Sequence, residues 1–323
     1  MSSQTRSSVK HILFIDPIKK LNPKKDTSLL MALTMKNLGL DVFLLLEEDF
    51  FLINQSKNIL KVYQFEGEFE NDGYYLKSFN LSSEKFLELS RSDVIHMRID
   101  PPFDTRYLRY LWMLRFFTTK GLRVINSPDG ILKFNEKLHA YSQKNSLETF
   151  VGSSVEGFTQ FSELMRKNHR DLILKPLDLY QGYGVEKISL EDPLLIKKFN
   201  EKVLENKGAI VAQPFCPDVV NGEIRSIYFK GKELGSILKV PKSGEFLANI
   251  AQGAAFHAIS LPTHVKNECD KISLELEKEG VDWIAYDILG EKVSEINITC
   301  PGLLVEVSYA HKKNLAKILI ENL

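Results

Sequence analysis

Short apolar runs alternate with amphipathic segments between His11 and Asn126, and this alternation constrains the fold more than any other feature of the chain. Apolar runs of this length indicate buried strands, whereas apolar residues spaced three and four apart indicate helices. Strands that alternate with helices predict an α/β domain in which helices cover a sheet. The predicted strands are residues 12–15, 42–46, 94–98 and 123–126, and the predicted helices cover 29–35 and 107–117.

The rest of the 323 residues follows a different pattern. Helices predicted over 137–142, over 160–166 and from Pro193 accompany strands at 172–175 and 185–190, which is typical of a small α+β unit. After a strand at 209–213, two predicted hairpins turn at Gly231 and Gly290, with covering helices at 265–279 and 305–322. The predicted division is a loose polar tail (1–9), an α/β domain (10–130), a central unit (131–206) and a C-terminal unit (207–323).

Charge and cysteine content exclude several classes of function. Lys and Arg number 42 and Asp and Glu number 42, so no basic excess favours nucleic acid. No apolar run approaches the roughly 20 residues that span a bilayer. The three cysteines, Cys216, Cys269 and Cys300, are too few and too widely spaced for a disulfide framework or a CxxC metal site. We therefore expect a cytoplasmic protein that acts on small molecules, with neither nucleic acid nor a membrane as its partner.

The predicted hairpin around Gly290 brings potential metal-binding side chains together. Side chains alternate along a strand, so Glu295 and Asn297 point to one face, and a three-residue loop over 290–292 places Asp287 opposite Glu295. Opposed carboxylates repel each other unless a cation lies between them, and carboxylate and amide oxygens suit Mg²⁺. The solvated outer face of a hairpin would have the same spacing, and a two-residue loop would break this geometry.

A lysine ends an apolar strand and precedes a loop that contains two glycines. Lys175 follows Asp171-Leu-Ile-Leu, and Gly182 and Gly184 come soon after it. A cation here can hold a phosphate while loop amides close over it, although lysines at strand edges and glycine turns also occur without any ligand. Neither GxxxxGK[ST] nor GxGxxG is present, which argues against those two nucleotide-binding folds. For Lys137, at a predicted helix start, the alternative is an ordinary exposed helix side chain.

Together these segments resemble bacterial glutathione synthetases, which are members of the ATP-grasp ligases, from about His11 to Ala316. The resemblance rests on several motifs in a fixed order, of which Asp-Pro-Pro-Phe-Asp, Leu-Lys-Pro-Leu-Asp and Glu-Ile-Asn are the most specific. The matching segments are Asp16-Pro-Ile18, Lys24-Lys-Asp-Thr-Ser28, Met97-Arg98, Asp100-Pro-Pro-Phe-Asp104, Asn135-Glu-Lys-Leu138, Leu172-Ile-Leu-Lys-Pro-Leu-Asp178, Ala212-Gln213, Asp287-Ile-Leu-Gly290 and Glu295-Ile-Asn-Ile-Thr299.

The resemblance implies an ATP-grasp fold with an N-terminal α/β (pre-ATP-grasp) domain. Residues 10–130 would bind substrate, 131–206 would form a lid over ATP, and 207–323 would form the catalytic part. The implied cofactors are ATP and Mg²⁺, with Mn²⁺ as an alternative metal, and the implied assembly is a homo-oligomer. The implied ATP contacts are Lys137, Lys175, Gln181, Gly182, Gly184, Gln213, Pro214, Phe215, Cys216 and Glu223; the metal ligands are Asp287, Glu295 and Asn297; the catalytic residues are Arg225 and Lys239; the substrate contacts are Asp26, Ser28, Arg98, Asp100 and Asn249.

The implied activity is an ATP-dependent ligation of a carboxylate to an amine through an acyl phosphate, joining γ-glutamyl-cysteine to glycine. Mg²⁺ and lysines would neutralise the triphosphate, and Arg225 would stabilise the tetrahedral intermediate. Two other interpretations remain open: a related ligase with a different acid or amine, and an ATP-binding regulator without catalysis. ADP release that depends on added acid and amine separates the two enzymes from the regulator.

Several positions depart from the family pattern. Lys239 begins a Lys-Val-Pro segment where the family has Arg-Ile-Pro, Phe246 and Phe256 stand near two expected arginines, and Val305 precedes Glu306 where the family has an arginine. Lysine lacks the planar, two-pronged contact that arginine makes with a carboxylate. We therefore expect the loop from Lys239 to Phe256 to present apolar surface to the substrate, so that the site accepts bulkier or less charged partners.

Overall fold

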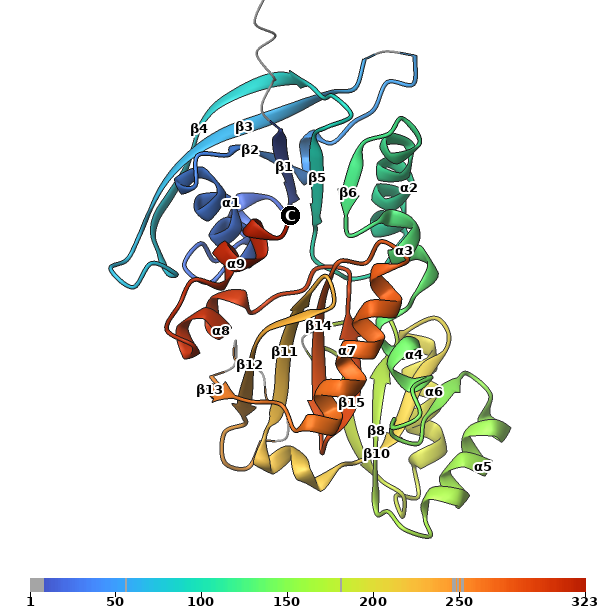
Figure 1. Cartoon of the computed structure of the whole chain (residues 1–323). Helices are drawn as coiled ribbons and strands as arrows, with labels where there is room; N and C mark the ends of the chain where they lie inside the picture. Colours follow the sequence, from blue (N-terminus) through green and yellow to red (C-terminus); the bar gives the residue numbers. More distant parts are fainter. Residues whose placement is uncertain (1–8, 56, 181, 246–247, 249, 251–252) are drawn as a thin grey trace, which may run out of the picture.

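The protein is built around three β-sheets (Figure 1). The computed structural model describes residues 9–55, 57–180, 182–245, 248, 250 and 253–323. The predicted loose tail therefore lies almost wholly outside the described residues, as do Gln181, Phe246 and Asn249. Within the described part of the chain, no helix is both long enough and apolar enough to cross a membrane.

The N-terminal sheet has six strands in the order β4-β3-β2-β1-β5-β6. The strands β2, β1, β5 and β6 run parallel, which confirms the predicted α/β class. A long antiparallel hairpin, β3–β4, extends this sheet and was not predicted. Burial alternates over the first half of β3, but most residues of β4 are exposed, so β4 lacks the apolar run that indicates a strand. The strand bounds are β1 Lys10–Ile15, β2 Asp41–Leu46, β3 Ile59–Phe69, β4 Leu76–Glu88, β5 Val94–Arg98 and β6 Arg123–Ile125.

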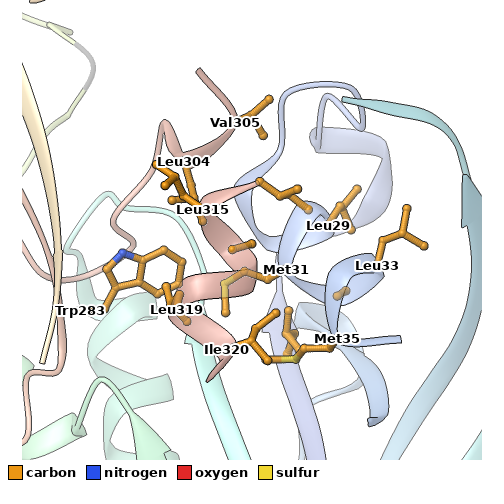
Figure 2. Close-up of a cluster of buried hydrophobic side chains, with 14 of the residues drawn as sticks. Leu29, Met31, Leu33, Met35, Trp283, Leu304, Val305, Leu315, Leu319 and Ile320 are labelled. Atoms are coloured by element: carbon orange, nitrogen blue, oxygen red, sulfur yellow. The ribbon is translucent and has the colours of Figure 1, made fainter. Parts of the chain in front are cut away.

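Helices cover both faces of this sheet. Helix α2 packs on one face, and α1 packs on the other together with two helices from the C-terminus, α8 and α9 (Figure 1). Figure 2 shows Leu319 and Ile320 of α9 facing Met31 and Met35 of α1, with the indole of Trp283 beside Leu319. One apolar core therefore joins the N-terminal and C-terminal sheets. The bounds are α1 Thr27–Asn37, α2 Thr105–Thr119, α8 Leu304–Ala310 and α9 Leu315–Glu321.

The predicted single helix over 305–322 is wrong, because two short helices replace it. Lys312 adopts a positive φ of 54°, which a continuing helix does not allow. Asn314 then caps α9 by accepting a hydrogen bond from the main-chain N–H of Ala316 at 3.0 Å. The Asn314 amide also donates to Thr34 Oγ1 and Gly73 O, so this turn ties the C-terminal helices to the N-terminal domain.

The central sheet has four strands in the order β7-β10-β8-β9. Helices α5 and α6 cover one face, and the opposite face carries Ile173, Lys175 and Gln213. Strand β10 pairs with β8 and β7 here, although the predicted division after residue 206 assigned it to the C-terminal unit. The bounds are β7 Phe150–Gly152, β8 Asp171–Pro176, β9 Glu186–Ser189, β10 Ile210–Pro214, α5 Val155–Met165 and α6 Leu195–Glu205.

The C-terminal sheet has five antiparallel strands in the order β13-β12-β11-β14-β15. Helix α7 covers one face, and α4 also packs against this core through Ala140. The other face meets the shared core at one end of its strands and is charged at the opposite end. The bounds are β11 Glu223–Phe229, β12 Lys232–Val240, β13 Ala255–Ile259, β14 Trp283–Leu289, β15 Lys292–Asn297, α3 Pro128–Lys133, α4 Glu136–Tyr141 and α7 Thr263–Glu277.

The β14–β15 hairpin reaches the predicted register by a different route. Its loop has two residues, Gly290 and Glu291, with positive φ values of 55° and 65° that suit a tight hairpin turn, so the predicted three-residue loop is wrong. The register then shifts by one residue at Ser294, where a β-bulge places an extra residue in β15. Asp287 consequently still lies opposite Glu295, as predicted.

One side chain joins the N-terminal domain to the C-terminal sheet. The amide of Asn126 donates to Trp283 O at 2.7 Å and to Ile298 O at 2.8 Å, and its oxygen accepts from Trp283 N–H at 2.8 Å. Asn126 is buried, so water cannot replace these bonds without a rearrangement.

We predict that Asn126→Ala lowers the free energy of unfolding by about 3–5 kcal/mol, because each buried main-chain group left unpaired costs about 1–3 kcal/mol. Urea denaturation followed by circular dichroism measures the change. Asn71→Ala, in the exposed turn between β3 and β4, is the control and should change the free energy by no more than about 0.5 kcal/mol. A loss below about 1 kcal/mol for Asn126→Ala would contradict a joining role.

Candidate functional site

A cavity of about 620 Å³ lies where the three sheets meet, and we call it the central cavity. Strands β8 and β10 line it from the central sheet, strands β11, β12, β14 and β15 line it from the C-terminal sheet, and the start of α1 and the end of β5 line it from the N-terminal domain. Its volume is within the range of small-molecule sites. The fold therefore brings segments from the whole length of the chain to one place.

Nearly all of the predicted site residues line this cavity. Gly184 does not, and Gln181 and Asn249 lie outside the described residues. The predicted residues that line the cavity are Asp26, Ser28, Arg98, Asp100, Lys137, Lys175, Gly182, Gln213, Pro214, Phe215, Cys216, Glu223, Arg225, Lys239, Asp287, Glu295 and Asn297.

A buried cluster of ionic side chains forms one wall. Arg225 makes a bidentate ion pair with Asp287, in which Nε donates to Oδ1 at 3.0 Å and Nη2 donates to Oδ2 at 2.7 Å. Lys239 donates to Asp287 Oδ1 at 2.9 Å and to Glu223 Oε2 at 2.7 Å. Burial alone raises the pKa of Asp287, but the charges of Arg225 and Lys239 outweigh burial and lower its pKa to about 2. This carboxylate is therefore ionised at any physiological pH.

Two more oxygen donors lie beside Asp287. Glu295 is its direct partner across the strand pair, and the Asn297 amide donates to Asp287 Oδ2 at 3.1 Å and to Ala285 O at 3.0 Å. These bonds leave Oδ1 as the Asn297 atom that could bind a cation. Among the described residues, no three Asp, Glu, His or Cys side chains converge as a metal site, so the amide would have to be the third donor. Two carboxylates and an amide oxygen fit a hard divalent cation such as Mg²⁺.

Lys137 is held in place by its partners rather than exposed on a helix surface. Its side chain is buried, with Nζ 3.0 Å from Glu295 Oε1 and 2.7 Å from Leu179 O. Its neighbour Glu136 accepts from the N–H groups of Ile298 and Thr299 at 2.7 and 2.8 Å, so the start of α4 is fastened to the end of β15. The alternative interpretation of Lys137 as an ordinary exposed side chain is therefore wrong.

Lys175 differs from Lys137 and Lys239 because, among the described residues, no carboxylate lies within ion-pair distance of its Nζ. The ammonium lies over the ring of Tyr141, 5.4 Å from the centroid. Burial lowers the pKa of Lys175, because the charged ammonium loses its hydration. The negative charges of Glu295, Glu223 and Asp287 raise this pKa, but they offset only part of the effect of burial. The lining of the cavity thus holds a desolvated cation with room for an anion beside it.

The loop after Lys175 depends on its glycines. Gly182 and Gly184 have φ values of 79° and 72°, and a Cβ atom on Gly184 would lie 2.8 Å from Pro176 Cγ. Leu179 of the same loop accepts the hydrogen bond of Lys137. The loop is therefore positioned against both lysines, and Gly184 serves its shape rather than lining the cavity.

The segment at the end of β10 is held by several local contacts. The N–H of Phe215 donates to Asp171 O at 2.9 Å, and its ring lies 3.8 Å below the ammonium of Lys187. Gln213 is buried and donates to Thr149 Oγ1 at 2.8 Å, so its amide has a fixed orientation. Pro214 has no N–H, and the N–H of Phe215 is bonded to Asp171. The next main-chain donor along the chain is therefore the N–H of Cys216.

The predicted substrate residues of the N-terminal domain form a second polar group. Asp26 caps α1 by accepting from Leu29 N–H at 2.8 Å, and burial raises the pKa of Asp26 to about 6. Ser28 accepts from Arg98 Nε at 3.0 Å. The N–H of Asp100 donates to Asp16 Oδ2 at 2.7 Å. Asp26 and Ser28 therefore serve the local structure while they also face the cavity.

The expectation that the altered loop presents apolar surface to the substrate is wrong for Phe256. This residue lies on β13 and packs against the shared core, with the centroid of its ring 6.0 Å from that of Tyr309. It does not line the cavity. Phe246 lies outside the described residues. Lys239, in contrast, lines the cavity and forms ion pairs with Glu223 and Asp287.

Glu306 lines the cavity and was not predicted as a site residue. It lies in the first turn of α8 and is 3% exposed, and burial raises its pKa. A single carboxylate inside the apolar run Leu303-Leu304-Val305-Glu306-Val307 is the sequence signal that could have found it, because buried acids need a partner.

Two family models match the chain. The model of the prokaryotic glutathione synthetase ATP-grasp domain matches residues 136–312, and that of the prokaryotic glutathione synthetase N-terminal domain matches residues 9–131. An ATP-grasp domain implies ATP binding in general.

Curated relatives match over nearly the full length. The glutathione synthetase of Vibrio parahaemolyticus is 30% identical over 92% of this chain and 92% of its own. The glutathione synthetase of Prochlorococcus marinus subsp. pastoris is 28% identical over 98% of this chain and 99% of its own.

Solved structures share the fold. D-cycloserine synthetase DcsG superposes with a TM-score of 0.66 at 14% identity, covering 96% of this chain and 99% of its own. The ATP-grasp ligase PsnB, solved with a phosphomimetic variant of a minimal precursor, Mg and ADP, superposes with a TM-score of 0.64 at 12% identity and 96% coverage of both chains. These likenesses establish the ATP-grasp fold.

Lys175→Met should raise the melting temperature of the ligand-free protein by about 1–3 °C, because it removes a desolvated charge that has no close partner. Differential scanning fluorimetry without ligands measures the shift. Lys197→Met, at an exposed site of α6 in the same unit, is the control and should leave the melting temperature unchanged. A clear decrease for Lys175→Met would mean that the ammonium stabilises the empty protein.

Proposed function

The chain belongs to the prokaryotic glutathione synthetase family and is an ATP-grasp ligase, and from this we propose that it joins the carboxylate of γ-glutamyl-cysteine to the amine of glycine, with ATP as the energy source. The observation that carries the proposal is the convergence of Arg225, Lys239, Asp287, Glu295 and Asn297 on one wall of the central cavity, whose lining also includes Lys137 and Lys175. This arrangement suits the transfer of a phosphoryl group to a carboxylate.

The lysines supply charge for the nucleotide. Lys175 carries an ammonium without a close carboxylate, so an anionic phosphate oxygen would relieve its desolvation. Lys137 is held between Glu295 and Leu179 O, and it would contact phosphate from that fixed position. We propose that the adenine lies against the segment from Gln213 to Cys216, where the hydrogen bond to Thr149 fixes the orientation of the Gln213 amide.

Asp287, Glu295 and Asn297 would hold Mg²⁺, which when bound neutralises phosphate charge and polarises the reacting phosphoryl group. Arg225 and Lys239 now satisfy Asp287. Arg225 and Lys239 would keep some of their N–H donors for the substrate when Asp287 also serves as a metal ligand. Those donors would then stabilise the negative oxygen that forms when the amine attacks the acyl phosphate.

Lys239, which stands where the family has an arginine, partly compensates for the loss of that arginine. It cannot make a two-pronged contact, but its ammonium lies 2.7 Å from Glu223 and 2.9 Å from Asp287, and these two ion pairs fix its position. Phe256 does not line the cavity, whereas Ala248 and Ile250 of the same loop do. The charged groups of Arg225 and Lys239 in the lining favour charged substrates such as γ-glutamyl-cysteine and glycine.

A phosphate-release screen tests the proposed function. The protein is given ATP and Mg²⁺ with γ-glutamyl-cysteine or other acids, each against glycine and a panel of amines, and the peptide product is identified by mass spectrometry. We expect the highest kcat/KM for γ-glutamyl-cysteine with glycine. A different best pair would overturn the substrate assignment, and phosphate release that never depends on an acid would overturn ligation itself.

Glu295→Ala should reduce ligation by about 100-fold or more at saturating Mg²⁺, because one of the two carboxylates that oppose each other is lost. Glu291→Ala, in the exposed turn of the same hairpin, is the matched control and should retain full activity. Turnover and melting temperature are measured for both variants. Near wild-type turnover of Glu295→Ala would show that this carboxylate does not bind the metal.

A further inference from the structure

Two histidines of the N-terminal sheet contact each other in the interior of the protein. His11 on β1 is 7% exposed and His96 on β5 is 1% exposed, and neither residue lines the central cavity. Nδ1 of His11 lies 3.1 Å from Nε2 of His96, and the centroids of the two rings are 5.4 Å apart. This distance is that of a hydrogen bond, so one of the two facing nitrogens carries a hydrogen and the other accepts it.

The histidine pair lies on the face of the sheet that packs against the C-terminal part of the chain. Side chains alternate along a strand, so His11 shares a face with Leu13, and His96 shares a face with Val94. Leu13 and Val94 belong to the shared core, which also contains residues of α9 and the indole of Trp283 (Figure 2). The pair is therefore part of the joint between the N-terminal and C-terminal sheets.

Two cations act on the pair, and one of them crosses the joint. Arg123 of β6 acts on both histidines, and Arg98, two residues after His96 on the same strand, acts on His96. Nη2 of Arg123 donates to Asp282 Oδ2 at 2.9 Å, and its Nη1 donates to Leu323 O at 3.1 Å. A proton gained by the pair therefore adds positive charge that repels a cation which links the two sheets.

One carboxylate acts in the opposite direction. Asp93 attracts a proton on His11, but its oxygens already accept from Lys10 Nζ at 3.1 Å and from the N–H groups of Lys10 and Ser90 at 2.9 and 2.7 Å. Asp41, the carboxylate of the neighbouring strand β2, lies opposite Lys10 and is exposed. Burial and the two arginines outweigh Asp93, so the pKa of each histidine of the pair lies below its usual value.

The contact itself limits how many protons the folded pair can hold. One added proton leaves the hydrogen bond intact, but a second would place hydrogens on both facing nitrogens, which are 3.1 Å apart. In the unfolded chain each histidine binds a proton independently, with a pKa of about 6.5. The unfolded chain therefore binds more protons than the folded chain below about pH 6.5. The contribution of the pair to stability is complete above this pH and is lost as the pH falls below it.

We propose that His11 and His96 form a pH-sensitive contact in the joint between the N-terminal and C-terminal sheets. While the pair is neutral, the joint is closed and the walls of the central cavity keep their relative positions. In mildly acidic solution, a proton on the pair repels Arg123 and loosens the joint. The inference goes beyond the proposed function, because it concerns the stability of the fold and is measured without any substrate.

The double variant His11→Asn/His96→Gln tests this contact. The two amides keep polar groups near the places of Nδ1 and Nε2 but do not gain a proton in this pH range. Urea unfolding at pH 6.5 and at pH 5.0 gives the unfolding equilibrium constant of the ligand-free protein. Between these pH values we expect this constant to increase at least about 10-fold more in the wild type than in the double variant. His257→Gln, at an exposed position of β13, is the matched control and should follow the wild type.

The fluorescence of Trp283 reports on the joint. Trp112→Phe leaves Trp283, which is 2% exposed, as the only tryptophan of the chain. From pH 7 to pH 5 we expect its emission to shift to longer wavelength, and we expect no such shift when the double variant is added to this background. A shift of equal size in both proteins would overturn the role of the pair in the joint.

The pH dependence of unfolding decides the proposal as a whole. The same increase of the unfolding equilibrium constant in the wild type and in the double variant would overturn it. Should the double variant fail to fold, the single variants His11→Asn and His96→Gln provide the test. Each removes one proton-binding site of the unfolded chain and should therefore weaken the pH dependence. An unchanged pH dependence in both single variants would overturn the proposal.

Discussion

The buried carboxylate of Asp287 constrains the rest of the site, because an ionised group of this burial survives only with partners on every side. Arg225 on β11, Lys239 on β12 and Asn297 on β15 all donate to it. These partners lie on the strands around β14, so the carboxylate fixes the register of the sheet where the sheet faces the cavity. A sheet slipped by one residue would turn these side chains toward the apolar core under α7. The network that stabilises the sheet therefore also positions the side chains proposed to bind the metal and the substrate.

The cavity keeps its shape because its walls share one core and several buried polar contacts. The helices α1, α8 and α9 pack between the N-terminal and C-terminal sheets. Asn126 and Glu136 satisfy main-chain groups at the ends of β14 and β15 from segments that are more than a hundred residues away in sequence. Such contacts cost free energy when they are broken, which makes the relative position of the walls well defined. The proposed substrate contact at Arg98 and the proposed ATP contact at Lys175 are then held at a fixed separation.

How much the sequence reveals depends on whether the signal is local. The alternation of strands and helices in the first 126 residues is local, and it predicts that part of the fold except for β3–β4, because most residues of β4 are exposed and form no apolar run. The opposition of Asp287 and Glu295 was predicted from spacing, but the loop was not, because the bulge at Ser294 depends on the whole sheet. The burial of Lys137 and the unpaired Oε2 of Glu306 arise from contacts between distant segments, which no local pattern encodes. Phe256 was assigned to the cavity from its position in a motif, yet its strand directs it to the shared core.

The fate of one oxygen atom tests this account most directly. The account requires that the substrate carboxylate attacks phosphorus, so that one carboxylate oxygen leaves with the phosphate when the amine attacks. γ-Glutamyl-cysteine labelled with ¹⁸O in its cysteinyl carboxylate is incubated with the protein, ATP, Mg²⁺ and glycine, and the released phosphate is analysed by mass spectrometry. We predict one labelled oxygen in each phosphate and one labelled oxygen left in each peptide. Peptide formation accompanied by unlabelled phosphate would contradict the acyl phosphate and, with it, the role assigned to the cluster around Asp287.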